Sequence, residues 1–207
     1  MVDDDGSVRT SLSRLFRSVG LQVEMFGSAS ELLQRLREIR PHCLVLDIRL
    51  PGVSGLELQR QLLAAETHTP IVFMTGHGDI PMSVRAMKAG AFDFLSKPFH
   101  DQDMLDAVAA AVQRDKLTRQ AADAEAKLRA AYKLLSERQR EVMALVTSGL
   151  LNKQIAARLG VSEITVKIHR RNLMQRVQAK SLPDLVRMAE SLGLHESTRS
   201  PDVSTRA

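Results

Sequence analysis

Three side chains that can take part in chemistry each come directly after a short apolar run. Asp47, Thr75 and Lys97 follow runs of four, four and six residues, and a Pro or Gly comes soon after each of them. Such runs are typical of buried strands that end in loops. In parallel α/β sheets, ligands are handled at the carboxyl ends of the strands. The sequence therefore predicts that a carboxylate, a hydroxyl and an ammonium meet at one edge of a sheet.

These residue types indicate phosphoryl chemistry. A carboxylate nucleophile such as Asp47 can accept a phosphoryl group and form an aspartyl phosphate. Asp3 and Asp4 could hold Mg²⁺ together with Asp47, since this cation prefers hard oxygen ligands. Lys97 would neutralise a phosphoryl oxygen and Thr75 would donate a hydrogen bond to another. Taken singly, Asp47 could cap a helix and Lys97 could be a surface cation, but their joint placement favours a site.

The elements that would position these residues alternate between strands and helices. Up to about residue 110, strand-like apolar runs alternate with stretches of helical spacing, which predicts βα units around a parallel sheet. Residues 113–135 contain no Gly or Pro and carry apolar residues at coiled-coil spacing: Leu117, Ala121, Ala124, Leu128, Ala131 and Leu135. We interpret this stretch as a helical spacer, with a short coiled coil as the alternative.

Composition narrows the class of protein. The chain has 207 residues, a single Cys and 3% aromatic residues, so it has no internal disulfide and few stacking groups for single-stranded nucleic acid. We find no signal peptide or membrane-spanning run and expect a cytoplasmic protein. Residues 1–135 carry 17 basic and 17 acidic residues, whereas residues 136–207 carry 12 and 7. The basic C-terminal part is therefore the candidate for binding nucleic acid.

That basic part has a helix-turn-helix pattern. A helix opening at Ser136 is followed by a short helix at residues 152–159, a turn at Gly160, and a third helix from Ser162 to Val177. The third helix would lie in the major groove. We expect its core face to hold Ile164, Val166, Leu173 and Val177, and its polar face to hold Thr165, Lys167, His169, Arg170 and Arg171. The alternative is an ordinary basic helical bundle.

The first part of the chain resembles the receiver domain of two-component response regulators. The matching motifs are Asp47 with residues 48–52, Thr75 with residues 76–79, and Lys97 with Pro98 and Phe99. The resemblance implies that Asp47 is the phosphoacceptor, that Asp3 and Asp4 hold Mg²⁺ with it, and that Thr75, Phe94 and Lys97 form the switch. It also implies a flavodoxin-like fold and a cis bond between Lys97 and Pro98.

The sequence departs from the receiver pattern at its start. Receivers begin with a central strand that leads to the acidic pair, but only Met1 and Val2 precede Asp3 here. We therefore expect a truncated first strand, with the true start upstream. A receiver with a gap in its sheet would expose unpaired backbone groups and lose stability.

Residues 135–194 resemble the four-helix LuxR-type DNA-binding domain, through the stretches at 149–156 and 165–169. The resemblance implies base contacts from Lys167, Ile168 and Arg171, phosphate contacts from Lys153, Thr165, His169 and Arg170, and a dimer surface on the last helix. Together the two halves resemble a FixJ-type regulator. We expect a receiver at 1–112, a linker at 113–135, a DNA-binding domain at 136–194 and a disordered tail at 195–207.

The resulting hypothesis is a phosphorylation-activated transcription factor and not an enzyme. Its implied partners are a histidine kinase, a second copy of the chain, a two-fold-related site on double-stranded DNA and RNA polymerase, without a membrane. A regulator that binds DNA independently of phosphorylation, with the receiver as a scaffold, is the alternative. A phosphatase of the haloacid dehalogenase type would need a second Asp two residues after Asp47, where this chain has Arg49.

Overall fold

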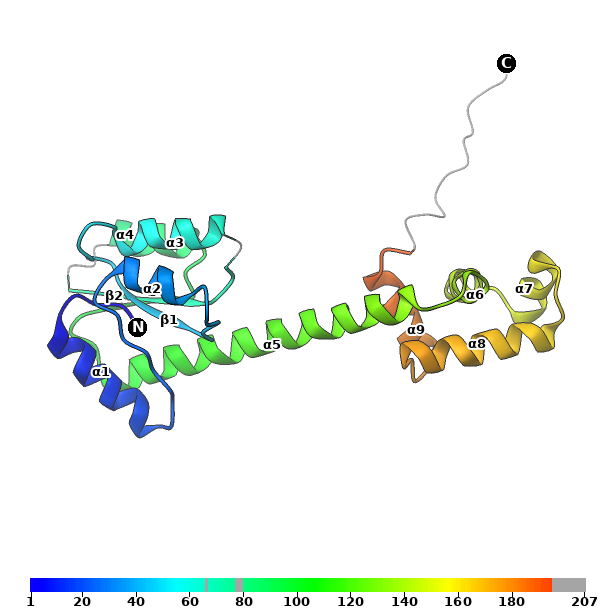
Figure 1. The fold of residues 1–207 in the computed structure, drawn as a ribbon, viewed down its shortest axis with the longest axis horizontal. Coiled ribbons are helices and arrows are strands. Elements are labelled where there is room, and N and C mark those ends of the chain that lie inside the picture. The colour runs from blue at the N-terminus through cyan, green and yellow to red at the C-terminus, as the bar shows by residue number, and fades with distance from the viewer. Residues whose placement is uncertain (66, 77–79, 195–207) are drawn as a thin grey trace, which may run out of the picture. The chain divides into compact units, whose positions relative to one another are not determined.

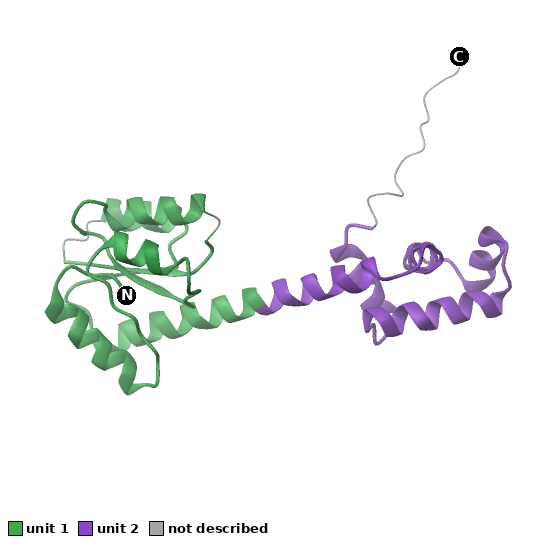
Figure 2. Ribbon diagram, viewed as in Figure 1, with its two compact units in different colours: residues 1–119 green, residues 120–207 purple. Residues whose placement is uncertain are grey.

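The computed structural model describes residues 1–65, 67–76 and 80–194. The chain forms two compact units, Met1–Arg119 and Gln120–Ala207 (Figure 2). The long helix α5 (Asp101–Lys133) begins in the first unit and ends in the second. The tail expected to be disordered, at 195–207, lies outside the described residues.

A parallel sheet forms the centre of the first unit. Its strands β1 (Leu44–Asp47), β2 (Ile71–Thr75) and β3 (Asp93–Ser96) lie in the order β1-β2-β3. Every residue of β1 and β2 is buried. Strands covered on both faces read as unbroken apolar runs, and this is why the sequence predicted them clearly.

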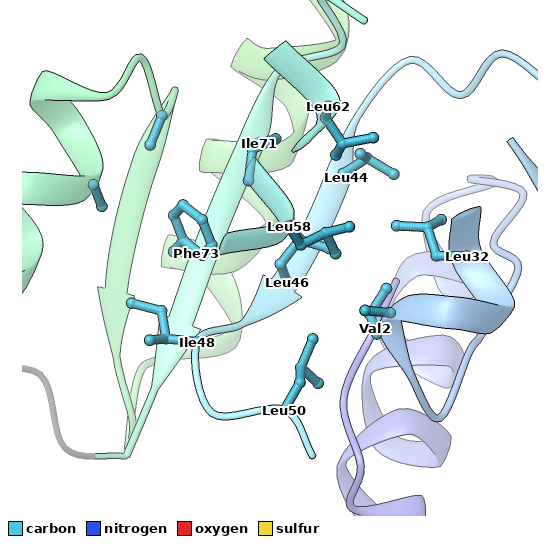
Figure 3. Packing of buried hydrophobic residues seen from close by; sticks show 13 residues of the cluster. Val2, Leu32, Leu44, Leu46, Ile48, Leu50, Leu58, Leu62, Ile71 and Phe73 are labelled. Carbon is cyan, nitrogen blue, oxygen red and sulfur yellow. The ribbon is translucent and has the colours of Figure 1, made fainter. Parts of the chain in front are cut away.

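Helices cover both faces of this sheet (Figure 1). On one face, α2 (Ala29–Arg35), α3 (Gly55–Ala64) and α4 (Ile80–Lys88) pack on Leu44, Leu46 and Phe73, as the close view of this core shows (Figure 3). On the other face, α1 (Gly6–Ser18) and the first part of α5 pack on Val45 and Val72. The predicted α/β fold is confirmed.

Val2 lies beside β1, on the side away from β2, and pairs with its neighbours as a single residue. It forms parallel bridges to both Phe26 and Leu46. The Val2 N–H donates to the Val45 carbonyl at 2.8 Å, and the Asp47 N–H donates to the Val2 carbonyl at 2.9 Å. The truncated first strand expected from the sequence is therefore present as a short bridge that ties Asp3 to the end of β1.

A cavity of about 580 Å³ lies next to Met1, between the segment around Val23 and the start of β1 at Leu44. Most of the side chains that line it are apolar, such as that of Phe16. The short run at residues 23–26 favours a strand in the sequence, but within the described residues this segment forms a sheet bridge only at Phe26. The Glu24 carbonyl also accepts from the Met1 ammonium at 2.8 Å. A longer pairing would need a neighbour in the position that the cavity now takes.

The second unit is helical. It contains the end of α5 and the helices α6 (Glu137–Thr147), α7 (Asn152–Leu159), α8 (Glu163–Val177) and α9 (Leu182–Ser191). Their core includes Val142, Met143, Ile155, Leu173 and Leu185, which are fully buried or nearly so. None of the helices in the described part of the chain combines the length and hydrophobicity needed to span a bilayer.

Candidate phosphoryl site and nucleic-acid interface

Asp3, Asp4, Asp47 and Lys97 form a cluster, hereafter the acidic site, at the carboxyl end of β1. Each of the three aspartates can place a carboxylate oxygen within 4.8 Å of the others. The Lys97 Nζ donates to Asp3 Oδ2 and to Asp47 Oδ2, both at 2.7 Å. Residues more than 90 positions apart in the sequence thus meet at this edge of the sheet, as the strand pattern had predicted.

Backbone groups hold both buried carboxylates in place. Asp3 Oδ1 accepts from the Asp5 N–H, and Asp47 Oδ1 accepts from the Arg49 N–H, each at 2.9 Å. Asp3 is fully buried and Asp47 nearly so, whereas Asp4 is exposed. Asp5 caps α1 by accepting from the Ser7 N–H, which fixes the chain just after the acidic pair.

Burial and ion pairing shift the pKa values of the side chains at this site in opposite directions. Burial raises the pKa of Asp3, and its hydrogen bond from Lys97 offsets part of that effect. Burial alone would lower the pKa of the Lys97 ammonium, but its bonds to Asp3 and Asp47 outweigh burial and raise it. Lys97 is therefore held protonated between two carboxylates whose combined charge it half neutralises.

The acidic site fits a divalent cation. Carboxylate oxygens are the ligands that Mg²⁺ prefers, and an exposed residue such as Asp4 leaves room for the water that this ion retains. Asp3, Asp4 and Asp47 would hold the ion, and Lys97 would then share two of the three carboxylates with it. The charge of the cluster favours a cation, since Lys97 leaves part of it uncompensated.

The predicted switch residues lie on the two neighbouring strands. Thr75 is fully buried at the end of β2, and its carbonyl accepts from the Lys97 N–H at 2.7 Å. Phe94 lies on β3 in register with Phe73 and is partly buried against the same core. The bond between Lys97 and Pro98 is cis, as expected. His77 and Asp79 lie outside the described residues.

Two residues that the sequence analysis did not single out support the acidic site. The Arg9 guanidinium donates to the Asp3 carbonyl at 2.6 Å. A Cβ on Gly55 would lie 2.5 Å from the Asp47 carbonyl and 3.1 Å from the Phe73 ring, so that only glycine fits where α3 starts. The turn from Pro51 to Gly55 was a signal in the sequence that could have pointed to Gly55 as a position of close packing. Nothing in the spacing of residues indicates Arg9.

The second unit has the geometry of a helix-turn-helix. Helix α7 ends at Gly160, whose φ of 65° lies in the left-handed region. Ser162 then caps α8 by accepting from the Thr165 N–H at 3.1 Å. The exposed face of α8 presents Lys167, Ile168 and Arg171. A glycine turn followed at once by a capped basic helix is the arrangement that places a recognition helix in the major groove.

The remaining predicted DNA contacts surround that face. Lys153 is exposed on α7, while Thr165, His169 and Arg170 are partly buried on α8. Arg170 donates to the Asn152 side chain at 3.3 Å, which links the two helices of the motif. A groove of about 530 Å³ runs along α8, and its lining includes Asn152, Lys167, Arg170 and Arg171.

The prediction that Ile164 belongs to the core was wrong. Its side chain is 70% exposed, whereas Val166, Leu173 and Val177 are buried as predicted. A step of two residues turns an α-helix by about 200°, so Ile164 lies opposite Val166 and one turn before Ile168. Ile164 and Ile168 thus add an apolar strip to the basic face, where such groups can contact the methyl of thymine.

Known proteins share both units. A family model described as the response regulator receiver domain matches residues 1–109, and one described as bacterial regulatory proteins of the luxR family matches residues 133–189. Nodulation protein W of Bradyrhizobium diazoefficiens is 57% identical over 194 residues, which cover 94% of this chain and 86% of that protein. The transcriptional regulatory protein FixJ of Rhizobium meliloti is 43% identical over 197 residues, covering 95% and 97%.

Solved structures agree with these matches. The response regulator StyR is 50% identical, with a TM-score of 0.78, and the likeness covers 91% of this chain and 96% of that one. Full-length FixJ from B. japonicum is 38% identical, with a TM-score of 0.58, over 93% and 95% of the two chains. The chain therefore belongs to the FixJ-type response regulators, which join a receiver domain to a luxR-type DNA-binding domain.

Proposed function

We propose that this response regulator is switched by phosphorylation of Asp47 and then binds promoter DNA as a dimer. The observation that carries the proposal is the position of the Asp47 carboxylate. It lies at the end of a buried strand, 2.7 Å from the Lys97 ammonium and within 4.8 Å of oxygens of Asp3 and Asp4. This arrangement supplies a nucleophile together with the positive charge that a phosphoryl group needs.

The phosphoryl group comes from the phosphohistidine of a partner histidine kinase. A carboxylate oxygen of Asp47 attacks the phosphorus, the P–N bond breaks, and the imidazole leaves with the bonding electrons. Lys97 pairs with an oxygen of the transferred group. Mg²⁺, held by Asp3, Asp4 and Asp47, supplies further charge neutralisation when bound. The backbone N–H of Arg49 keeps Asp47 oriented.

Thr75 and Phe94 carry the change outward. The Thr75 hydroxyl bonds to the phosphoryl group, and Phe94 on the adjacent strand shifts inward. The face formed by α4, β3 and α5 then pairs with a second copy of the chain. Ile80, Val84 and Met87 expose apolar surface on α4, which such a pairing would bury. The phosphoryl group thus shifts the population between two receiver states.

The dimer presents two α8 helices to a two-fold-related site on double-stranded DNA. Lys167, Ile168 and Arg171 contact bases. Lys153, Thr165, His169 and Arg170 contact phosphates and set the position of the helix. Helix α9 supplies the contact between DNA-bound copies.

The proposed division of the chain is a receiver at 1–112, a linker at 113–135 and a DNA-binding domain at 136–194. The protein works in the cytoplasm with a histidine kinase, promoter DNA and RNA polymerase as its partners. It is a regulator and not an enzyme, since the phosphoryl group modifies its own side chain and no separate substrate is turned over.

Binding to a pool of random-sequence DNA duplexes tests this function. At fixed salt, with Mg²⁺ and a small phosphoryl donor such as acetyl phosphate, we expect the wild-type chain to bind at least about tenfold more tightly than without the donor, because two linked domains bind better than one. The control variant, Asp47→Asn, should bind equally with and without it. Equal wild-type affinities in the two conditions would favour the alternative, a regulator that binds DNA independently of phosphorylation.

A further inference from the structure

A buried carboxylate ends the apolar face of α5 in the first unit. Met104, Val108 and Ala111 follow one another at spacings of four and three residues and pack on the sheet. Asp115 is next at this spacing and is 5% exposed. A buried charge at a position that continues an apolar face is costly unless it is paired. Asp115 therefore needs partners, and its contacts decide how α5 is held.

Two side chains bond to the same oxygen of Asp115. The His42 Nδ1 lies 2.6 Å from Asp115 Oδ2, and the Arg119 Nε donates to that oxygen, also at 2.6 Å. An ionised carboxylate can only accept, so Nδ1 is the donor in the first bond. Because the Asp115 carboxylate is withdrawn from water, these bonds are worth more than an exposed pair on a helix surface.

The same cluster ties α5 to the loop before β1. Arg119 Nη2 donates to the Pro41 carbonyl at 2.8 Å, and the Thr69 hydroxyl donates to the same carbonyl at 3.3 Å. Pro41 and His42 lie just before β1, with only Cys43 between His42 and the strand that ends at Asp47. The helix is thus fastened to a segment far from it in the sequence.

The exposed middle part of α5 begins directly after Arg119. Arg119 is the last residue of that unit (Figure 2). Residues 120–127 are all exposed, and the helix regains packing only from Leu128 onward, where it contributes to the core of the second unit. The position at which α5 leaves the first unit is therefore set by the last bonds that hold it.

We propose that Asp115, His42 and Arg119 form a latch that fixes where the linker helix leaves the receiver. With the latch closed, α5 is held to Arg119. With it open, the apolar face holds α5 only to Val112, which is partly buried against the same core, and residues 113–119, about two helical turns, are freed. The latch thus determines how much of the linker helix moves together with the receiver.

Hydrogen exchange of the full-length chain, followed by mass spectrometry, tests the latch. Asp115→Asn and Arg119→Gln should each speed exchange of amides at 113–119 by about tenfold or more, because each removes a charge-assisted bond. Exchange at 104–112 and at 120–127 should stay as in the wild type. The matched control is Asp123→Asn, an exposed aspartate on the same helix.

Two outcomes would overturn the proposal. The first is exchange at 113–119 that is the same in Asp115→Asn as in Asp123→Asn. The second is exchange at 113–119 that is unchanged in Arg119→Gln, a variant that leaves Asp115 bonded to His42. This second result decides the matter if Asp115→Asn unfolds the whole unit, which faster exchange in β2 would reveal.

Discussion

Replacing Lys97 with methionine removes a cation from between two buried carboxylates while keeping a similar stem. The Lys97 side chain is 23% exposed, and those of Asp3 and Asp47 are 1% and 10% exposed. Breaking a buried ion pair by removing one partner costs about 3–5 kcal/mol. Partial exposure of Lys97 places this case at the low end, at about 3 kcal/mol, because water screens some of the remaining repulsion.

That loss corresponds to a large shift in melting temperature. The first unit comprises Met1–Arg119. With an unfolding entropy of roughly 2.1 cal/mol/K per residue, a unit of this size loses about 4 °C for each kcal/mol. We therefore expect the Lys97→Met variant to melt about 12 °C lower in metal-free buffer. Differential scanning calorimetry measures this directly and separates the transitions of the two units if they unfold independently.

Mg²⁺ provides the second half of this test. A divalent cation bound to Asp3 and Asp47 would replace the missing charge, so the melting temperature of Lys97→Met should rise more with Mg²⁺ than that of the wild type. The matched control is Lys88→Met, an exposed lysine on α4. The reasoning fails if both variants melt within a degree or two of the wild type, or if Mg²⁺ raises Lys97→Met no more than the wild type.

Three further predictions address the acidic site, the sheet and the DNA-binding surface. Burial raises the pKa of Asp3, so its ionised form opposes folding, while Lys97 keeps Asp47 as a partner when Asp3 is replaced. Asp3→Asn should therefore be more stable than wild type in EDTA at neutral pH, and the difference should close as pH falls towards 3.8, the ordinary pKa of an aspartate; denaturant titrations that give equal stability at neutral pH would contradict this. A short run of apolar residues fused ahead of Met1 should raise the melting temperature. The Val45 carbonyl accepts from the Val2 N–H, and the Val45 N–H points to the same side of the strand, so a residue placed before Met1 could accept from it and fill part of the cavity that Val45 lines. An unchanged melting temperature would refute this explanation. Lys153→Ala should weaken DNA binding and lower the slope of log affinity against log salt by about 0.9, because it removes one phosphate contact, whereas Lys127→Ala on the exposed part of α5 should leave both unchanged in the same salt titration.

The position of the acidic site could be predicted from the sequence because buried parallel strands appear in it as unbroken apolar runs. Asp47, Thr75 and Lys97 each end or follow one of them, and parallel strands place their ends together. The same reasoning was weaker at residues 23–26, where pairing depends on a neighbour that is here a single residue, Val2. Strand formation there is set by tertiary context and not by local pattern.

The contacts of Asp115 could not be predicted from local sequence patterns. His42 and Asp115 are 73 positions apart, and neither stands in a recognisable motif. Asp115 interrupts an apolar spacing, which on its own reads as the end of a buried face. Its partners follow from the path of α5 past the loop before β1, which spacing does not specify. The requirement for glycine at position 55 could not be predicted from local spacing either. It arises because the start of α3 approaches the Asp47 carbonyl so closely that a Cβ does not fit.

Ile164 illustrates a different error, in which residue type outweighed periodicity. An isoleucine on an amphipathic helix was assigned to the core, although its offset from Val166 places it on the opposite face. Counting the helical period strictly would have assigned it to the exposed side, beside Ile168.

Intact mass after incubation with Mg²⁺ and acetyl phosphate tests the central claim most directly. The wild-type chain should gain the mass of one phosphoryl group, and Asp47→Asn should gain none. A gain would show that the one-residue bridge at Val2 holds Asp3 well enough for the site to work. No gain in the wild type, or an equal gain in both proteins, would contradict phosphorylation at Asp47.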